Sequence, residues 1–180
     1  MAVRYWVGGT NTWDATTTSN WANSSGGAGG QSVPGSADSV FFDANSGANT
    51  VTLGYNPSIF ILSMTGFTGT LAFGTQNITL TGNAATIFSG ATTYSITGTA
   101  VINCNYSGST GTRTLSFGQV TEANSISFNI TAGSDAITLT NTGNFKNLDY
   151  TGFSGSCLFN NHTVYGNLTL SSGMTISGGQ

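Results

Sequence analysis

Six carboxylates and one histidine are the side chains of this 180-residue chain that could support acid–base chemistry. The carboxylates belong to Asp14, Asp38, Asp43, Glu122, Asp135 and Asp149. Hydrolysis of a glycan on a β-helix needs two carboxylates roughly 5 to 9 Å apart. Asp38 and Asp43 are the closest pair along the sequence. Their separation is an odd number of residues, so a regular strand that joins them places their side chains on opposite faces. Asp149 occupies a repeated motif in which the other copy has Ser63, which indicates an exposed, tolerant position. We therefore favour a chain without a carboxylate-pair active site.

No other catalytic or metal-binding signature is present in the sequence. His162 has no local nucleophile or acid that would complete a triad, so we expect a solvated side chain at a turn. The segment 43–47 (DANSG) resembles the opening of a calcium loop, but it lacks the third ligand and the later Glu, so an Asx-type turn is favoured. There is no GxGxxG after a strand, no P-loop and no His/Cys cluster. We predict no enzymatic activity, no metal and no cofactor.

Aromatic and thiol side chains offer further candidates. Trp6, Trp13 and Trp21 could stack on the faces of sugar rings, or could pack together as the small core of a cap, which is the alternative we favour. Cys104 and Cys157 are too few and too far apart for a disulfide scaffold or a CxxC site, and we expect buried free thiols.

The composition excludes several classes of function. Charged residues make up 5% of the chain, with a net charge of −3, against about 25% charged in a typical soluble domain. The three cations, Arg4, Arg113 and Lys146, are too few for a basic patch, so we predict no nucleic-acid binding. No apolar run approaches the roughly 20 residues of a membrane span, and residues 1–9 lack the apolar region and cleavage site of a secretory signal.

Two regions follow one another along the chain. Residues 1–49 carry all three tryptophans and long Gly/Ser-rich pieces, and we interpret them as a capping module. Residues 50–180 contain short runs in which apolar residues alternate with Ser, Thr and Asn, bounded by Gly or Asn. This period of two is typical of strands with one buried and one exposed face. The chain is therefore predicted to be all-β.

Internal similarity favours a β-solenoid, that is, a parallel β-helix, over the alternative of a β-sandwich. The motif containing Gly66, Phe67 and Gly69 recurs 86 residues later as Gly152, Phe153 and Gly155. One coil of a solenoid takes roughly 20 to 30 residues, so the offset corresponds to three or four coils. We expect the shared TGFxG corner to recur at equivalent places on the stack.

A solenoid needs both of its ends covered, because end coils expose unpaired backbone and core. The tryptophan module is suited to cover the N-terminal end. Residues 168–180 (LTLSSGMTISGGQ) contain no charge, proline or polar helix that would blunt the other end. We expect that either the natural protein continues or another subunit covers this end.

The first 45 residues resemble an N-terminal module of tailed-phage structural proteins. The resemblance rests on RYWVGGTNTWD at residues 4–14, NW at 20–21, GGAGG at 26–30, VP at 33–34 and DSVFFD at 38–43. The TGFTGTL and TGFSGSC segments are similar to the repeats that follow this module in long tail-associated proteins, often of marine viruses. The resemblance implies a β-helical component of a virion that leaves cells by lysis, and it supplies no catalytic residues.

Together these observations predict a non-enzymatic, rigid structural protein of a phage tail fibre or appendage, located in the virion outside cells. Its expected partners are further copies of itself, in a trimer or a head-to-tail filament, and other virion proteins. The alternative is a carbohydrate-binding module that recognises a host-surface glycan through the tryptophans or a Ser/Thr/Asn ladder. A glycan depolymerase is the third hypothesis.

Overall fold

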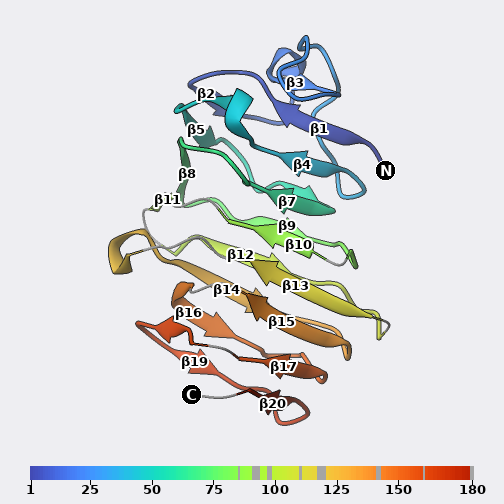
Figure 1. Cartoon of the computed structure of the whole chain (residues 1–180), viewed down its shortest axis with the longest axis vertical. Coiled ribbons are helices and arrows are strands. Elements are labelled where there is room, and N and C mark those ends of the chain that lie inside the picture. Colours follow the sequence, from blue (N-terminus) through green and yellow to red (C-terminus); the bar gives the residue numbers. More distant parts are fainter. Residues whose placement is uncertain are drawn as a thin grey trace.

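The chain folds into a stack of coils in a computed structural model that describes residues 1–84, 86–90, 94–96, 99–109, 111–116, 121–140, 143–159 and 161–178. The coils follow one another from the N-terminal to the C-terminal end (Figure 1). Each strand pairs in parallel with strands of the adjacent coils, except β3 (Trp21–Ala22), which is antiparallel to β1 (Val3–Trp6). This parallel pairing confirms the β-solenoid and rules out the β-sandwich, which is built from antiparallel sheets.

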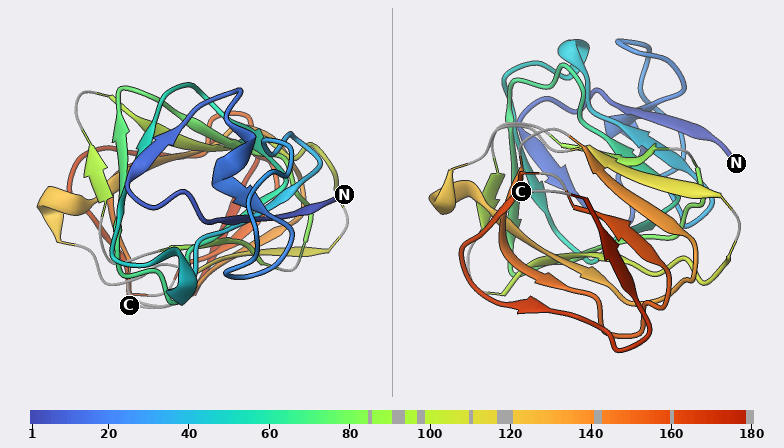
Figure 2. Two further views of the ribbon diagram at one scale, coloured as in Figure 1. Left: turned by 90° about the horizontal axis from the view of Figure 1, so that it is seen from above. Right: turned by 60° about the horizontal axis from the view of Figure 1, so that its bottom comes forward.

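Three sheets in the described residues form the sides of the solenoid, and Figure 2 shows them around a common interior. Sheet 1 contains, in spatial order, β3, β1, β4 (Ser39–Phe41), β7 (Ile61–Ser63), β10 (Thr86–Ser89), β13 (Thr112–Ser116), β15 (Ala136–Thr140), β17 (Ser156–Leu158) and β20 (Thr175–Ser177). Sheet 2 contains β2 (Asn11–Trp13), β5 (Thr50–Leu53), β8 (Thr70–Gly74) and β11 (Tyr94–Ile96). Sheet 3 contains β6 (Ser58–Ile59), β9 (Ile78–Leu80), β12 (Val101–Cys104), β14 (Ile126–Ile130), β16 (Asn144–Asp149) and β18 (Thr163–Val164), and β19 (Leu168–Thr169) also pairs with β16. Short 3-10 helices lie between strands, namely η1 (Thr18–Asn20), η2 (Ala44–Ser46) and η3 (Glu122–Asn124).

The coils shorten toward the C-terminal end. Val40, Leu62, Phe88 and Leu115 are successive partners in sheet 1, so one turn takes between 22 (62 minus 40) and 27 (115 minus 88) residues. Later turns are shorter: Leu158 is followed by its partner Ser177 after 19 residues (177 minus 158). In the described part of these later coils the chain passes from sheet 1 directly to sheet 3 without a strand in sheet 2.

The interior is filled by the alternate apolar residues of the strands, as the period of two predicts. In β5, Val51 and Leu53 are buried while Thr50 and Thr52 are exposed. Burying one such side chain is worth about 1.5 to 3 kcal/mol. One hydrophobic cluster extends from Trp6 to Cys157. The tryptophan region therefore shares one core with the coils that follow it, and its strands β1 and β2 pair with β4 and β5 of the next coil.

The two TGFxG motifs form the same turn. Gly66 and Gly152 have φ angles of 82° and 91°, a region that favours glycine. The phenylalanine that follows each of them is buried. At Gly69 a Cβ would collide with a backbone oxygen of the preceding coil and with the ring of Phe67, and Gly155 is crowded in the same way.

The motifs nevertheless lie at different corners, contrary to the expectation of equivalent places. The first copy joins β7 to β8, at the corner between sheets 1 and 2. The second joins β16 to β17, at the corner between sheets 3 and 1. The reason is that the motif specifies a local bend with a ring pointing inward, which any corner accepts. Its spacing therefore does not count coils.

Candidate functional site

The three tryptophans, which belong to β1, β2 and β3, pack against one another in the interior of the N-terminal end. The ring of Trp21 lies 5.1 Å from the rings of both Trp6 and Trp13, in edge-to-face geometry, and Phe42 lies 5.9 Å from Trp6 and from Trp13. The indoles are at most 1% exposed, and Trp6 Nε1 donates a hydrogen bond to the Gly9 carbonyl at 2.9 Å. The rings have no free face on which a sugar could stack in this structure.

The N-terminal edge of sheet 1 is covered by the chain itself. Outside β3, the Gln31 amide donates to the carbonyl of Trp21 at 3.0 Å, and the Gly30 amide donates to Thr18. The antiparallel β3 is only two residues long. Short, covered edges of this kind do not offer a template for another strand.

Three of the six carboxylates accept hydrogen bonds from backbone amides of the N-terminal region. Asp14 accepts hydrogen bonds from the Thr17 hydroxyl and from the backbone amides of Thr16 and Thr17, which lower its pKa to about 2. Asp38 accepts from the amides of Ala2 and Gly35. Asp43 accepts from the Asn45 amide and forms a capping box with Ser46 at η2, which is the expected Asx-type turn. In the described residues no three His, Cys, Asp or Glu side chains are grouped as metal ligands, and no helix is long and apolar enough to cross a membrane.

A buried ion pair lies beside the second TGFxG corner. Arg113 Nε is 2.6 Å from Asp135 Oδ2, and Arg113 Nη2 is 2.8 Å from Asp135 Oδ1. The guanidinium also lies 5.3 Å from the Tyr106 ring centre and 5.9 Å from that of Phe153. The two charged side chains are at most 1% exposed. This bidentate pair therefore has a structural role inside the stack.

Cys104 and Cys157 are free and buried, as expected. Burial raises the pKa of the Cys104 thiol to about 12 and also raises the pKa of Cys157. The Tyr150 hydroxyl lies 3.0 Å from Cys157 Sγ, and burial raises the pKa of this tyrosine as well. Thiols held in the protonated form are poor nucleophiles and metal ligands.

His162 differs from the expected solvated side chain. Its ring is half-buried and lies 5.7 Å from the rings of Phe145 and Phe159. Its Nδ1 is 3.1 Å from the Gly143 carbonyl oxygen. The cause is that the chain after β17 brings the ring of His162 back against Phe145 of β16, a residue of the preceding coil.

The coil at residues 161–178 exposes apolar side chains, and we call Leu168, Leu170 and Ile176 the end patch. They are 46%, 50% and 43% exposed. Ile176 is the sheet partner of the buried Cys157, so it occupies an inward position that the described residues leave uncovered. In the part of the chain that the structure describes, β20 is the last strand in the order of sheet 1 and pairs only with β17.

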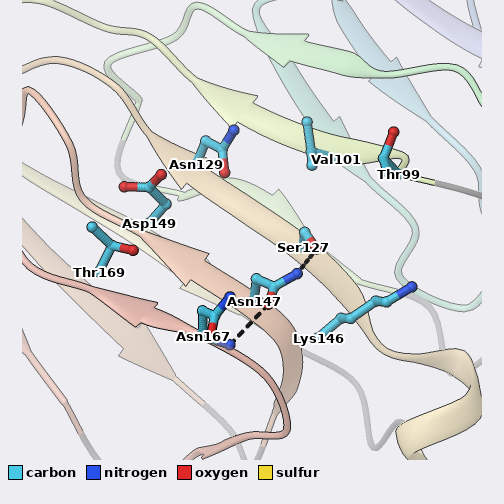
Figure 3. A pocket seen from close by; sticks show the side chains of 9 residues that line it. All are labelled: Thr99, Val101, Ser127, Asn129, Lys146, Asn147, Asp149, Asn167 and Thr169. Atoms are coloured by element: carbon cyan, nitrogen blue, oxygen red, sulfur yellow. Dashed lines mark hydrogen bonds between the residues drawn. The ribbon is translucent and has the colours of Figure 1, made fainter.

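A polar groove runs across the outer face of sheet 3 (Figure 3), and its floor and walls include Ser127, Asn129, Lys146, Asn147, Asp149 and Asn167. It contains two adjoining hollows of about 300 and 380 Å³, which share Lys146 and Asn147. The second hollow extends to η3, where Glu122 lies, and to Tyr165. The side chains that line the groove come from four stacked coils.

A β-bulge shapes this groove. Ile126 is paired with Phe145 and Phe128 with Leu148, so Lys146 and Asn147 together lie opposite the one residue Ser127. Asn147 Nδ2 donates to Ser127 Oγ at 3.1 Å, and Asn147 Oδ1 accepts from the Asn167 amide at 2.8 Å. Bulges re-aim side chains and are frequent at functional sites.

A ladder of polar residues follows the same face. Asn103, Asn129, Asp149 and Thr169 are successive partners in sheet 3, and Asn129 Nδ2 donates to Asn103 Oδ1 at 3.2 Å. Such ladders are expected when identical small polar residues stack about 4.8 Å apart. The Ser/Thr/Asn pattern of the sequence predicts such ladders in general, but it does not locate the groove or its bulge.

The spacing of apolar residues contains a signal for the bulge. In 145–148 (FKNL), two polar residues separate Phe145 from Leu148, whereas strict alternation allows one. A break in the period of two, within a run that otherwise reads as a strand, indicates an extra residue in that strand. The pairing with Ser127 is long-range and has no such signal.

No protein-family model, curated protein or solved structure matches the chain.

Proposed function

We propose that the chain is a non-enzymatic structural protein, a rigid segment of a phage tail fibre or appendage that associates with further copies through its end patch. The supporting observation is the contrast between its two ends. At the N-terminal edge, Gln31 donates to the Trp21 carbonyl beside β3, and the three indoles are buried. At the other end, Leu168, Leu170 and Ile176 are exposed next to β20, whose outer side has no strand partner among the described residues.

Unpaired strand edges and exposed core side chains favour association between copies of the chain. A strand edge with free backbone groups beside apolar side chains pairs readily with another chain. In a closed oligomer every subunit contributes the same surface, so the apolar end patches of all subunits can be buried together around the symmetry axis. We therefore favour a closed assembly, such as a trimer, in which the end patches meet, over a head-to-tail filament. Other virion proteins are further partners under this proposal, and the site of action is the virion outside the cell.

The remaining support is the make-up of the coils. Parallel pairing joins every coil to its neighbours. The carboxylates in the N-terminal turns and the buried Arg113–Asp135 pair stabilise the fold. A stack of short coils held by backbone ladders is stiff along its axis, which suits a spacer or a host-facing surface.

Sedimentation equilibrium over a range of concentrations tests the proposal with a pair of matched variants. Ile176→Lys introduces a charge into the end patch, and Val3→Lys introduces the same charge at the opposite end, where Val3 is 40% exposed against 43% for Ile176. We expect the wild type and Val3→Lys to form the same oligomer and Ile176→Lys to be monomeric with an unchanged circular dichroism spectrum. A wild-type protein that stays monomeric at about millimolar concentration contradicts the proposal.

A further inference from the structure

We propose that the polar groove on sheet 3 is a binding site for an uncharged oligosaccharide. This inference goes beyond the structural role proposed above and does not depend on it. It rests on three observations about the groove: its supply of hydrogen-bonding groups, its balance of charge and its fixed shape.

The hydrogen-bonding groups suit sugar hydroxyls, which both donate and accept. An Asn side chain offers two donors and an acceptor, and a Thr hydroxyl offers both roles. Within the described residues, the side chains of Asn167 and Thr169 have no hydrogen-bond partner, so both are available to a ligand. Asn129 retains its amide oxygen, because its Nδ2 donates to Asn103.

The charges in and beside the groove nearly cancel. Lys146 supplies one positive charge and, in the part of the chain that the structure describes, forms no ion pair. Asp149 lines the same hollow and Glu122 lines the adjoining one. Recognition of phosphate, sulfate or carboxylate groups needs an excess of cationic donors. One lysine between two carboxylates favours a ligand without charge.

The shape of the groove is fixed before any ligand binds. Asn147 is held from both sides, by Ser127 Oγ and by the Asn167 amide, and Ser127 is only 6% exposed. The floor consists of the parallel strands β12, β14, β16 and β19, which pair with one another in that order, with the bulge between β14 and β16. A preformed site avoids the entropy cost of ordering side chains on binding.

The second hollow adds an aromatic ring. Tyr165 is 40% exposed, and its hydroxyl accepts a hydrogen bond from Asn144 Nδ2 at 3.0 Å, which fixes the ring. Aromatic faces contact the apolar faces of sugar rings while a polar edge stays in water. Because the hollows share Lys146 and Asn147, one sugar unit can lie on the Asn ladder while the next lies against Tyr165.

Titration of the full chain by isothermal calorimetry tests the proposal. The probes are neutral hexasaccharides of glucose, mannose, galactose and N-acetylglucosamine, with hexagalacturonate and a sulfated hexasaccharide as charged comparators. We expect saturable binding of at least one neutral probe, with a Kd between about 1 μM and 1 mM. Asn167→Ala and Tyr165→Ser should each weaken it by about tenfold or more, because each removes a direct contact.

The matched control is Thr138→Ala, a half-buried strand residue of sheet 1 outside the groove, which should leave the Kd unchanged. Ile176→Lys should also bind normally, so that a failure of assembly and a failure of sugar binding are told apart. The proposal is overturned if no neutral probe binds at millimolar concentration, if the charged comparators bind more tightly, or if the groove variants bind as the wild type does.

Discussion

The buried pair of Arg113 and Asp135 permits the sharpest energetic prediction. Two short contacts of 2.6 and 2.8 Å join side chains that are at most 1% exposed. Asp135→Ala leaves the guanidinium buried without its counter-charge, which typically costs about 3 to 5 kcal/mol. An exposed pair would contribute only about 0 to 1 kcal/mol. For a domain of this length the loss corresponds to a decrease in Tm of about 6 to 20 °C.

Urea and thermal denaturation of Asp135→Ala, Arg113→Met and the double variant measure this effect. We expect each single variant to lose several kcal/mol and the double variant to regain most of the loss, because no isolated charge then remains buried. The coupling between the two positions should change little with salt, since buried charges are weakly screened. A loss below about 1 kcal/mol in Asp135→Ala, or strictly additive single effects, would refute the reasoning.

Three further predictions concern the turns and the thiols. Gly155→Ala should lower the free energy of unfolding, because the added Cβ collides with the Asp135 carbonyl oxygen and the Phe153 ring. Gly35→Ala should not lower it, because the space around an added Cβ there is open. The urea midpoints of the two variants measure both effects. The pKa of Asp14 is lowered from 3.8 to about 2, so its stabilising contribution is complete above pH 3.8 and is lost as the pH falls toward 2. The difference in urea midpoint between the wild type and Asp14→Asn should therefore shrink over that interval. A difference that stays constant with pH would contradict this prediction. Cys104 and Cys157 should resist a thiol reagent at pH 8 in the native protein and react at once in urea, and rapid native reaction would show that the thiols are accessible.

The fold could be predicted from the sequence because its determinants are local. Alternation such as Val51 and Leu53 against Thr50 and Thr52 gives the strands, and the TGFxG repeat indicates short, similar coils. The phase of the coils could not be predicted in this way. Gly66 and Gly152 form the same turn at different corners, because a turn motif encodes a bend and not the length of chain between bends.

The candidate site was less accessible to sequence reasoning because it is made by stacking. Ser127 and Asn147 are brought together by the register of β14 and β16, and that register depends on how Phe128 and Leu148 share the core. The position of His162 was predicted wrongly for the same reason, since its contact with Phe145 comes from the preceding coil. Residue types alone do not determine which coils meet.

Electron microscopy of the purified protein tests the central claim most directly, because it shows whether copies associate and by which end. The account predicts closed oligomers whose end patches, with Leu168, Leu170 and Ile176, meet at the centre while the tryptophan-containing ends point outward. Separate compact particles at every concentration, or assemblies joined through the tryptophan-containing end, would contradict it.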